Sequence, residues 1–251
     1  MRSRDIVVAA TIFTLLSASA YAQAETETLT PLQVAVACTL PSTLATPRPS
    51  GLRVAGAQDT VSRSTYGPGD LLILSGGTKA GLELGQRFYL RRAVTFGGEA
   101  ANGRHAVRTA GWARVIALNE TTAIAAVEVA CAAILQGDYL DQFAAPEVPD
   151  GADRTDTSGQ PDFSTLGHVL FGNEEVRAGG TGDFMLIDRG MSQGLTAGVR
   201  LAIYRDLQVN GVPLTWIGEG IVISSSPDTA LMRITTARDA VETDDLVAIR
   251  K

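Results

Sequence analysis

The side chains that most often carry enzyme chemistry are scarce in this sequence. Its two histidines, His105 and His168, lie far apart along the chain, and neither lies beside a cysteine. A zinc site needs histidine and cysteine side chains at short, regular spacing. The glycine-rich segment Gly-Gly-Thr-Lys-Ala-Gly lacks the spacing of a phosphate-binding loop. We therefore expect no metal, no cofactor and no enzymatic activity.

Four aspartates occupy repeated positions: Asp70 corresponds to Asp183, and Asp138 corresponds to Asp245. Each follows a Gly or an Asp at the start of a strand-like run, where a carboxylate can accept a hydrogen bond from a turn. A glycan hydrolase could instead use two carboxylates as its acid and base. Because the positions recur in both halves of the chain, we favour the turn role. An envelope glycan hydrolase with an unrecognised carboxylate pair remains the alternative.

Arginines are concentrated in one part of this acidic chain, whose formal net charge is −6. The cluster consists of Arg87, Arg91, Arg92, Arg104, Arg108 and Arg114. It could bind an anionic glycan or an acidic patch of a protein, and the alternative is a solvated strand face. The acidic balance argues against nucleic acid as a partner. Trp112 and Trp216 could stack on a sugar if exposed, but their places near a central strand favour burial.

Residues 1–24 have the pattern of a secretory signal peptide. Arg2 and Arg4 precede an apolar run, and small residues allow cleavage after Ala22 or Ala24. No later segment has the length of a membrane span, so we expect a mature protein that is periplasmic or secreted.

Export would place both cysteines in an oxidising compartment, where a Cys38–Cys131 disulfide is favoured over two separate buried thiols. Closing the long loop between them would contribute roughly 4 kcal/mol to stability.

An internal repeat organises the rest of the sequence. Residues 69–92 align without a gap with residues 182–205, which indicates a duplication. We predict that Gly77 turns the chain in the left-handed conformation, that Leu82 closes one end of the domain, and that Gly85 begins the next strand. The identical turn positions are Gly77, Gly81, Leu82 and Gly85 in the first copy and Gly190, Gly194, Leu195 and Gly198 in the second.

Each copy predicts short antiparallel strands. Residues 71–74 form an apolar run bounded by turns, residues 86–92 partly alternate, and Asn119-Glu120 lies at the tip of a hairpin pattern. About five short strands with tight turns predict a small antiparallel barrel and an all-β fold. The predicted boundaries are a signal peptide at 1–24, an arm at 25–50, a domain at 51–143, a flexible linker at 144–163 with almost nothing to bury, and a second domain at 164–251.

The motif shared by the two copies consists of Gly-Asp, four apolar residues, a Gly-x-x-x-Gly-apolar-x-x-Gly turn and a late Gly-Asp. It resembles the C-terminal domain of flagellar assembly protein T, which is also found in exported bacterial proteins that carry LysM modules. The likeness covers roughly residues 51–143 and 164–250, and the second copy has Asp244 in place of the last Gly. It is similar, too, to uncharacterised exported proteins with two such domains.

This resemblance implies tandem SH3-like β-barrels of the bacterial envelope that act by binding or scaffolding. We therefore expect a non-enzymatic binding or scaffolding protein whose partner is an envelope protein or an anionic glycan such as peptidoglycan. A periplasmic accessory subunit of a larger envelope or flagellar-type assembly is a second alternative. The sequence leaves the oligomeric state open.

Overall fold

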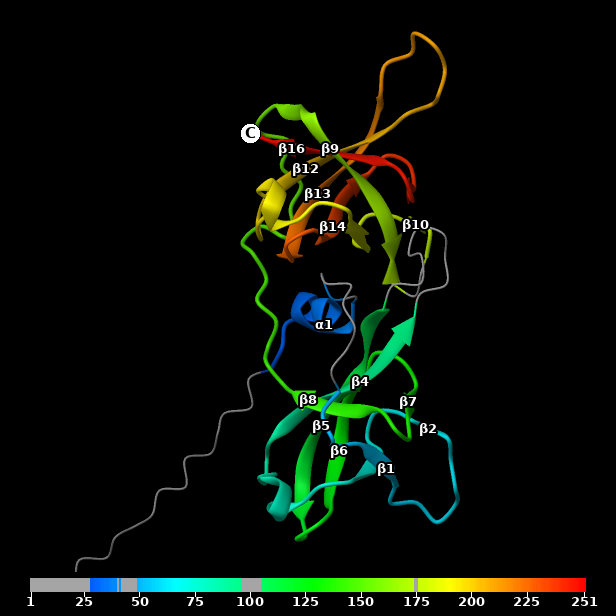
Figure 1. The fold of residues 1–251 in the computed structure, drawn as a ribbon, viewed down its shortest axis with the longest axis vertical. Coiled ribbons are helices and arrows are strands. Elements are labelled where there is room, and N and C mark those ends of the chain that lie inside the picture. Colours follow the sequence, from blue (N-terminus) through cyan, green and yellow to red (C-terminus); the bar gives the residue numbers. More distant parts are fainter. Residues whose placement is uncertain (1–27, 40, 42–48, 96–104, 174–175) are drawn as a thin grey trace, which may run out of the picture.

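The computed structural model describes residues 28–39, 41, 49–95, 105–173 and 176–251 (Figure 1). The predicted signal peptide and Arg104 lie outside the described residues. These residues are mostly β-structure, with one α-helix and short 3-10 helices. In chain order the elements are α1 (Pro31–Cys38), β1 (Val54–Ala57), β2 (Thr65–Tyr66), β3 (Leu71–Leu74), η1 (Thr78–Ala80), β4 (Arg87–Thr95), β5 (His105–Leu118), β6 (Ala123–Ala130), β7 (Ile134–Leu135), β8 (Tyr139–Gln142), β9 (Pro161–Gly172), β10 (Ala178–Gly179), β11 (Phe184–Ile187), η3 (Met191–Gln193), β12 (Arg200–Arg205), β13 (Thr215–Ser225), β14 (Ala230–Ala237), β15 (Val241–Glu242) and β16 (Leu246–Arg250).

Residues 161–251, which we call unit 2, contain a closed barrel of antiparallel strands in the order β11-β14-β13-β12-β16-β9. Strands β10 and β15 form a separate pair beside it. Strand β9 begins at Pro161, ahead of the predicted boundary at residue 164.

Residues 51–143, which we call unit 1, form a six-stranded antiparallel sheet in the order β1-β3-β6-β5-β4-β8. Its two outer strands approach each other, because Arg53 forms a β-bridge with Tyr139 and the Leu140 N–H donates to the Leu52 carbonyl at 3.0 Å. Strands β2 and β7 pair separately, as β10 and β15 do. The strand orders of the two units therefore correspond element by element.

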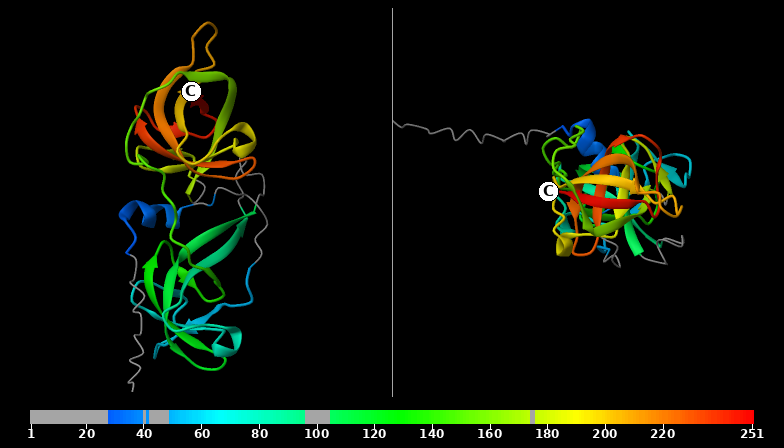
Figure 2. Two further views of the ribbon diagram at one scale, coloured as in Figure 1. Left: turned by 90° about the vertical axis from the view of Figure 1, so that its left-hand side faces the viewer. Right: turned by 90° about the horizontal axis from the view of Figure 1, so that it is seen from above.

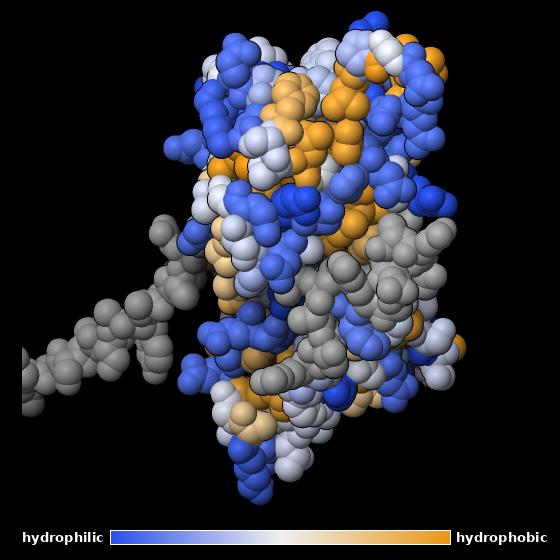
Figure 3. All heavy atoms as spheres, turned by 45° about the horizontal axis from the view of Figure 1, so that its top comes forward, coloured by the Kyte–Doolittle hydropathy of each residue, from blue (hydrophilic) through white to orange (hydrophobic). Residues whose placement is uncertain are grey.

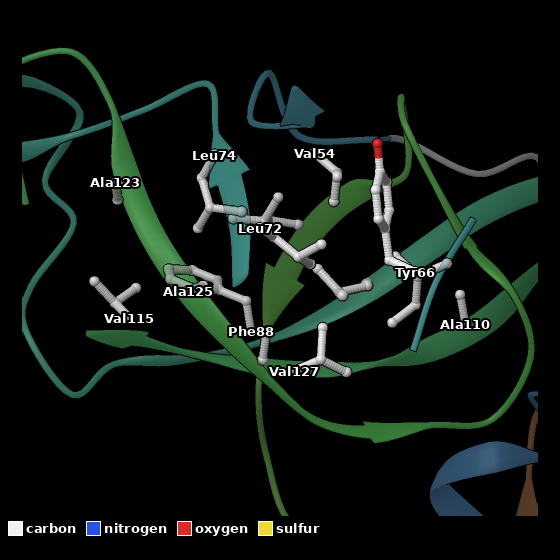
Figure 4. Close-up of a cluster of buried hydrophobic side chains, with 14 of the residues drawn as sticks. Val54, Tyr66, Leu72, Leu74, Phe88, Ala110, Val115, Ala123, Ala125 and Val127 are labelled. Atoms are coloured by element: carbon white, nitrogen blue, oxygen red, sulfur yellow. The ribbon is translucent and has the colours of Figure 1, made fainter. Parts of the chain in front are cut away.

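Each unit has its own apolar interior, and Figure 4 shows that of unit 1. Phe88 and Leu90 of β4 lie in this interior while Tyr89 belongs to a cluster on the other face, which confirms the predicted alternation. Leu82 and its equivalent Leu195 are 4% and 1% exposed and belong to the interiors of units 1 and 2.

The glycine turn after β3 differs from the prediction at Gly77. This residue has a φ of −139°, so its predicted left-handed conformation is wrong, and Gly81 takes that conformation with a φ of 78°. Glycine is required at position 77 because a Cβ atom would lie 2.1 Å from the carbonyl oxygen of Asn119. Gly190 repeats this close approach, at 2.1 Å from the carbonyl oxygen of Ser226. The left-handed glycines of the two turns are Gly81, Gly85, Gly194 and Gly198.

Helix α1 lies between the two units (Figures 1 and 2). Its first turn is closed by a capping box, in which the Gln33 N–H donates to Thr30 Oγ1 at 3.2 Å and the Thr30 N–H donates to Gln33 Oε1 at 2.9 Å. At its other end Cys38 is bonded to Cys131, which confirms the predicted disulfide across a sequence separation of 93 residues. A helix of eight residues is too short to be stable alone, so packing and the disulfide hold it in place.

The segment 144–160, part of the predicted linker, contacts unit 2. Ala152 is 1% exposed, and its carbonyl oxygen accepts a hydrogen bond from Arg233 Nη1 at 2.7 Å. The carbonyl oxygen of Gly151 accepts another from Arg200 Nη2 at 2.9 Å. The expectation that this segment has almost nothing to bury is therefore corrected at Ala152, which packs against unit 2.

The units meet in a third apolar cluster. Val94 and Ala106, which face each other in the β4–β5 hairpin of unit 1, contact an outer face of the unit 2 barrel, and α1 and Val148 pack beside them. The unit 2 members of the cluster are Phe171, Leu170, Phe184, Leu186, Ile221, Ile223 and Leu231. This contact stacks the units along the long axis of the molecule (Figure 2).

Candidate functional site at the junction of the two units

The repeated aspartates close turns, as predicted. Asp70 Oδ2 accepts a hydrogen bond from the Gly67 N–H at 2.8 Å, and Asp183 Oδ2 accepts one from the Gly180 N–H at 2.8 Å. The Gly67 N–H, assisted by the Arg63 guanidinium, lowers the pKa of Asp70. The fold therefore favours the ionised form of the Asp70 carboxylate.

The second pair of aspartates binds arginines that also repeat. Asp138 is 2% exposed and receives Arg92 Nε at 2.7 Å and Nη2 at 2.8 Å. In unit 2, Asp245 receives Arg205 Nε at 2.8 Å and Nη2 at 2.7 Å, which raises the pKa of Arg205. Each aspartate also accepts the N–H of the residue three positions before it. Arg92 is therefore a structural residue that fastens the closing strand of its unit.

Two further arginines of the predicted cluster share one carboxylate. Arg87 Nε donates to Glu128 Oε2 at 2.8 Å, and Arg114 Nε donates to Glu128 Oε1 at 2.5 Å. Arg108 is half-buried on β5. The structure thus brings Arg87 and Arg114 together, around an acidic partner.

Arg91 is the member of the cluster that lines a pocket. Its Nη1 donates to Asp141 Oδ2 at 2.5 Å, and its guanidinium lies 4.6 Å from the centroid of the Tyr89 ring. Burial raises the pKa of Tyr89, whose hydroxyl donates to the Ala144 carbonyl at 2.7 Å. The Nε atom of Arg91 is buried and has no hydrogen-bond partner among the described residues.

The pocket lies where α1, the segment after β8 and both units meet. Its volume is about 720 Å³, and its walls are mainly apolar, with Val36 from α1, Val107 from β5 and Ile223 from β13. Thr39, which follows α1, also lines the pocket; it is 7% exposed and has an Oγ1 atom without a hydrogen-bond partner in the described part of the chain. Arg91 and Thr39 therefore line an apolar recess, and each has a buried polar atom that makes no hydrogen bond within the described residues.

An aromatic cluster supports this recess. Trp112 is 2% exposed, in agreement with the favoured interpretation, and lies edge-on to Tyr89 with ring centroids 6.1 Å apart. Phe143 contacts both rings, at 4.7 Å from Tyr89 and 5.7 Å from Trp112. Ala37 of α1 packs against the cluster, so the disulfide-bonded arm covers this face of unit 1.

Unit 2 has different chemistry at the same register. Glu219 is 1% exposed and accepts Arg250 Nε at 2.8 Å, Arg250 Nη2 at 2.6 Å and Trp216 Nε1 at 2.8 Å. Trp216 is half-buried. Strand pairing gives the equivalent positions, because Tyr89 pairs with Trp112 as Ala202 pairs with Glu219, and Gln142 pairs with Phe88 as Ile249 pairs with Leu201. The aromatic residues Tyr89, Trp112 and Phe143 of unit 1 therefore correspond to Ala202, Glu219 and Arg250 of unit 2.

Ser192 is a residue that the predictions above do not include. It lies in Gly-Met-Ser-Gln-Gly, which has the spacing of the nucleophile turn in serine hydrolases. In the structure it belongs to η3 and does not have the positive φ of a strained nucleophile turn. The corresponding residue of η1 is Lys79. The motif at Ser192 is therefore a turn of the repeated fold.

The histidines have local contacts. His168 Nδ1 lies 3.0 Å from Asp188 Oδ2, and Asp188 Oδ1 also accepts the His168 backbone N–H at 2.7 Å. Ser75 accepts the N–H of Arg53 in the same way in unit 1, at 2.8 Å. His105 Nδ1 lies 3.0 Å from the hydroxyl of Thr95. In the described part of the chain, no three His, Cys, Asp or Glu side chains are grouped to hold a metal ion.

Comparison of the sequence with protein-family models and with curated proteins gives no match. Within the described residues, no helix combines the length and apolar content needed to cross a bilayer.

Proposed function

We propose that the chain is an exported, non-enzymatic binding or scaffolding protein of the bacterial cell envelope, built from two tandem SH3-like β-barrels. The signal-peptide pattern and the Cys38–Cys131 disulfide support export to an oxidising compartment. The corresponding strand orders of units 1 and 2 support the tandem arrangement.

The observation that carries the binding role is the pocket at the junction. Arg91 Nε and Thr39 Oγ1 are buried donors without partners in the described structure, and the surrounding walls are mainly apolar. Leaving such atoms unsatisfied is unfavourable, so a ligand with acceptor oxygens beside an apolar part would stabilise them. A segment of an envelope protein or an acidic glycan such as peptidoglycan has these groups.

The contacts of the repeated carboxylates also favour a binding protein over a glycan hydrolase. Asp138 and Asp245 are each occupied by an arginine and a turn N–H, and Asp70 and Asp183 each accept a turn N–H. A general acid needs a carboxyl group that can hold a proton near neutral pH, which cationic partners and N–H donors oppose.

Sedimentation with purified peptidoglycan tests the proposal. The wild type should sediment with the intact polymer, whereas Arg91→Met should lose most of this binding. Asp141, the partner of Arg91, is 47% exposed on its side chain, so the substitution should reduce stability by no more than about 1 kcal/mol. Arg154→Met, which removes an arginine that is 81% exposed and outside the pocket, is the control and should bind as the wild type does.

Release of soluble muropeptides in the same experiment would overturn the proposal in favour of a hydrolase, and Ser192→Ala would then show whether the serine is needed. If the polymer is neither bound nor cleaved, a pull-down from the native host distinguishes the accessory-subunit form of the proposal. A protein captured by the wild type and by Arg154→Met, but not by Arg91→Met, would support that form.

A further inference from the structure

The contact between units 1 and 2 has two parts, and each part has a counterpart in the other unit. The first part is the end of a hairpin, where Val94 of β4 faces Ala106 of β5. The second part is an outer barrel face, where Leu186, Ile223 and Leu231 are 0%, 2% and 1% exposed beneath that hairpin, α1 and the segment after β8. Unit 1 supplies the hairpin and unit 2 supplies the face.

Unit 2 carries a hairpin at the corresponding place in its fold, between β12 and β13. Strands β12 and β13 correspond to β4 and β5, but their pairing ends at Arg205 and Thr215. Leu207, which lies at the same distance along the repeat as Val94, therefore belongs to the loop between the two strands. The loop between them, residues 206–214, which we call the donor loop, extends from the end of the molecule remote from unit 1 (Figures 1 and 2). Its apolar side chains are exposed: 51% for Leu207, 57% for Val209 and 45% for Val212. Figure 3 shows hydrophobic side chains exposed among hydrophilic ones at this end.

Unit 1 carries the same face without the hairpin that covers it in unit 2. Ile73 is paired with Ile124 in the β3–β6 ladder, as Leu186 is paired with Leu231 in the β11–β14 ladder. Ile116 lies in the β5 bulge beside them and is the equivalent of Ile223. We call Ile73, Ile116 and Ile124 the acceptor face. Ile116 is 45% exposed, and the other two are half-buried.

We propose that the donor loop of one molecule docks on the acceptor face of a second copy of this chain, giving head-to-tail oligomers. The contact would repeat, between molecules, the packing that already joins units 1 and 2 within one molecule. A second copy is the occupant that fits, because both parts are apolar versions of surfaces already complementary in this fold. The donor loop lies at the far end from unit 1, so it cannot reach its own acceptor face.

Such a contact is heterologous, since each partner contributes a different surface, and it does not close after two molecules unless the rotation brings the ends together. Each added molecule presents a new donor loop and a new acceptor face. The mass should therefore rise beyond that of a dimer as the protein concentration increases. The inference does not depend on the ligand of the junction pocket.

Sedimentation equilibrium of the purified protein over a wide concentration range tests this assembly. Val209→Asp places a carboxylate in the donor loop, and Ile116→Asp places one on the acceptor face. Both positions are largely exposed, so each variant should fold, which near-UV circular dichroism checks. Each variant alone should lose association and remain a monomer. Val61→Asp changes a valine that is 69% exposed and belongs to neither surface, and it should associate as the wild type does.

The decisive sample is an equal mixture of Val209→Asp and Ile116→Asp. The first retains its acceptor face and the second retains its donor loop, so the mixture should form a complex of two chains and stop there. A wild type that stays monomeric at every concentration would overturn the inference. So would a mixture that stays monomeric while the wild type associates, because the intact acceptor face of one variant should bind the intact donor loop of the other. Association of either variant alone to the wild-type extent would also overturn it.

Discussion

Glu219→Ala should strongly destabilise unit 2. The Glu219 carboxylate is 1% exposed and binds Arg250 through two hydrogen bonds and Trp216 through one, and it raises the pKa of Arg250. Removing one partner of a buried ion pair costs about 3–5 kcal/mol, because the other charge stays buried without compensation. Arg250 Nη1 retains its bonds to the carbonyls of Thr157 and Gly159. We therefore expect the lower end, about 3 kcal/mol.

Urea unfolding followed by far-UV circular dichroism and by tryptophan fluorescence measures this effect. With a slope of about 2 kcal/mol per M, the loss corresponds to a midpoint lowered by about 1.5 M. Glu120→Ala is the matched control: its ion pair with Lys79 has side chains that are 76% and 68% exposed, so its removal should cost less than about 1 kcal/mol. Equal losses for the two variants would refute the reasoning.

Replacing both members of the buried pair distinguishes two contributions to the loss of stability: the attraction between Glu219 and Arg250, and the cost of leaving Arg250 buried without its partner. Glu219→Leu combined with Arg250→Leu should recover most of the stability lost in Glu219→Ala, because neither side chain then leaves an unpaired charge. A double variant that is less stable than Glu219→Ala would show that the pair itself contributes the energy.

Three further predictions concern the disulfide, the glycine turns and alkaline pH. Cys38→Ser should lower stability by about 4 kcal/mol, as measured by urea unfolding, since it opens a loop with a sequence separation of 93 residues; wild type and variant should coincide under reducing conditions. Gly190→Ala should lower the melting temperature far more than Gly194→Ala. A Cβ atom added at Gly190 would lie 2.1 Å from the carbonyl oxygen of Ser226, whereas one added at Gly194 would meet no atom within 4 Å and cost only the roughly 1–2 kcal/mol of a left-handed φ. Equal melting temperatures for the two variants would contradict the clash. Burial raises the pKa of Tyr89, so the folded state holds this proton more tightly than the unfolded chain. The contribution of Tyr89 to stability is complete when the pH is below its pKa in the unfolded chain, about 10, and is lost as the pH rises through its higher pKa in the folded state. Tyr89→Phe should therefore lose less stability between neutral and strongly alkaline pH than the wild type.

The features that were predictable from sequence depend on short-range contacts. The turn role of Asp70 follows from a hydrogen bond to Gly67, only three residues away. The alternation of Phe88, Tyr89 and Leu90 follows from the geometry of a single strand. Such signals need no knowledge of how strands are arranged around a barrel.

The features that were missed depend on tertiary register. Arg87 contacts Glu128 across 41 positions of sequence, and the ion pairs of Arg87 and Arg114 with this carboxylate form only when β4, β5 and β6 lie side by side. Gly77 lies in a glycine-rich segment typical of a left-handed turn. Glycine is required there, however, because the backbone of Asn119, in the turn between β5 and β6, leaves no room for a Cβ atom. The pocket needs α1 between two units, and the apolar character of residues 32–38 was its only sequence signal.

The different outer faces of the two units also bear on folding errors. Two barrels with corresponding strands in one chain can exchange strands and form a hybrid, a known hazard of tandem repeats. A hybrid that placed β16 beside β4 would set Arg250 among Tyr89 and Trp112 without a carboxylate. It would also leave Glu219 facing Phe143 in the complementary hybrid. Each mispaired barrel would thus bury an uncompensated charge, so this divergence between the copies disfavours the exchange of β8 and β16 between the units.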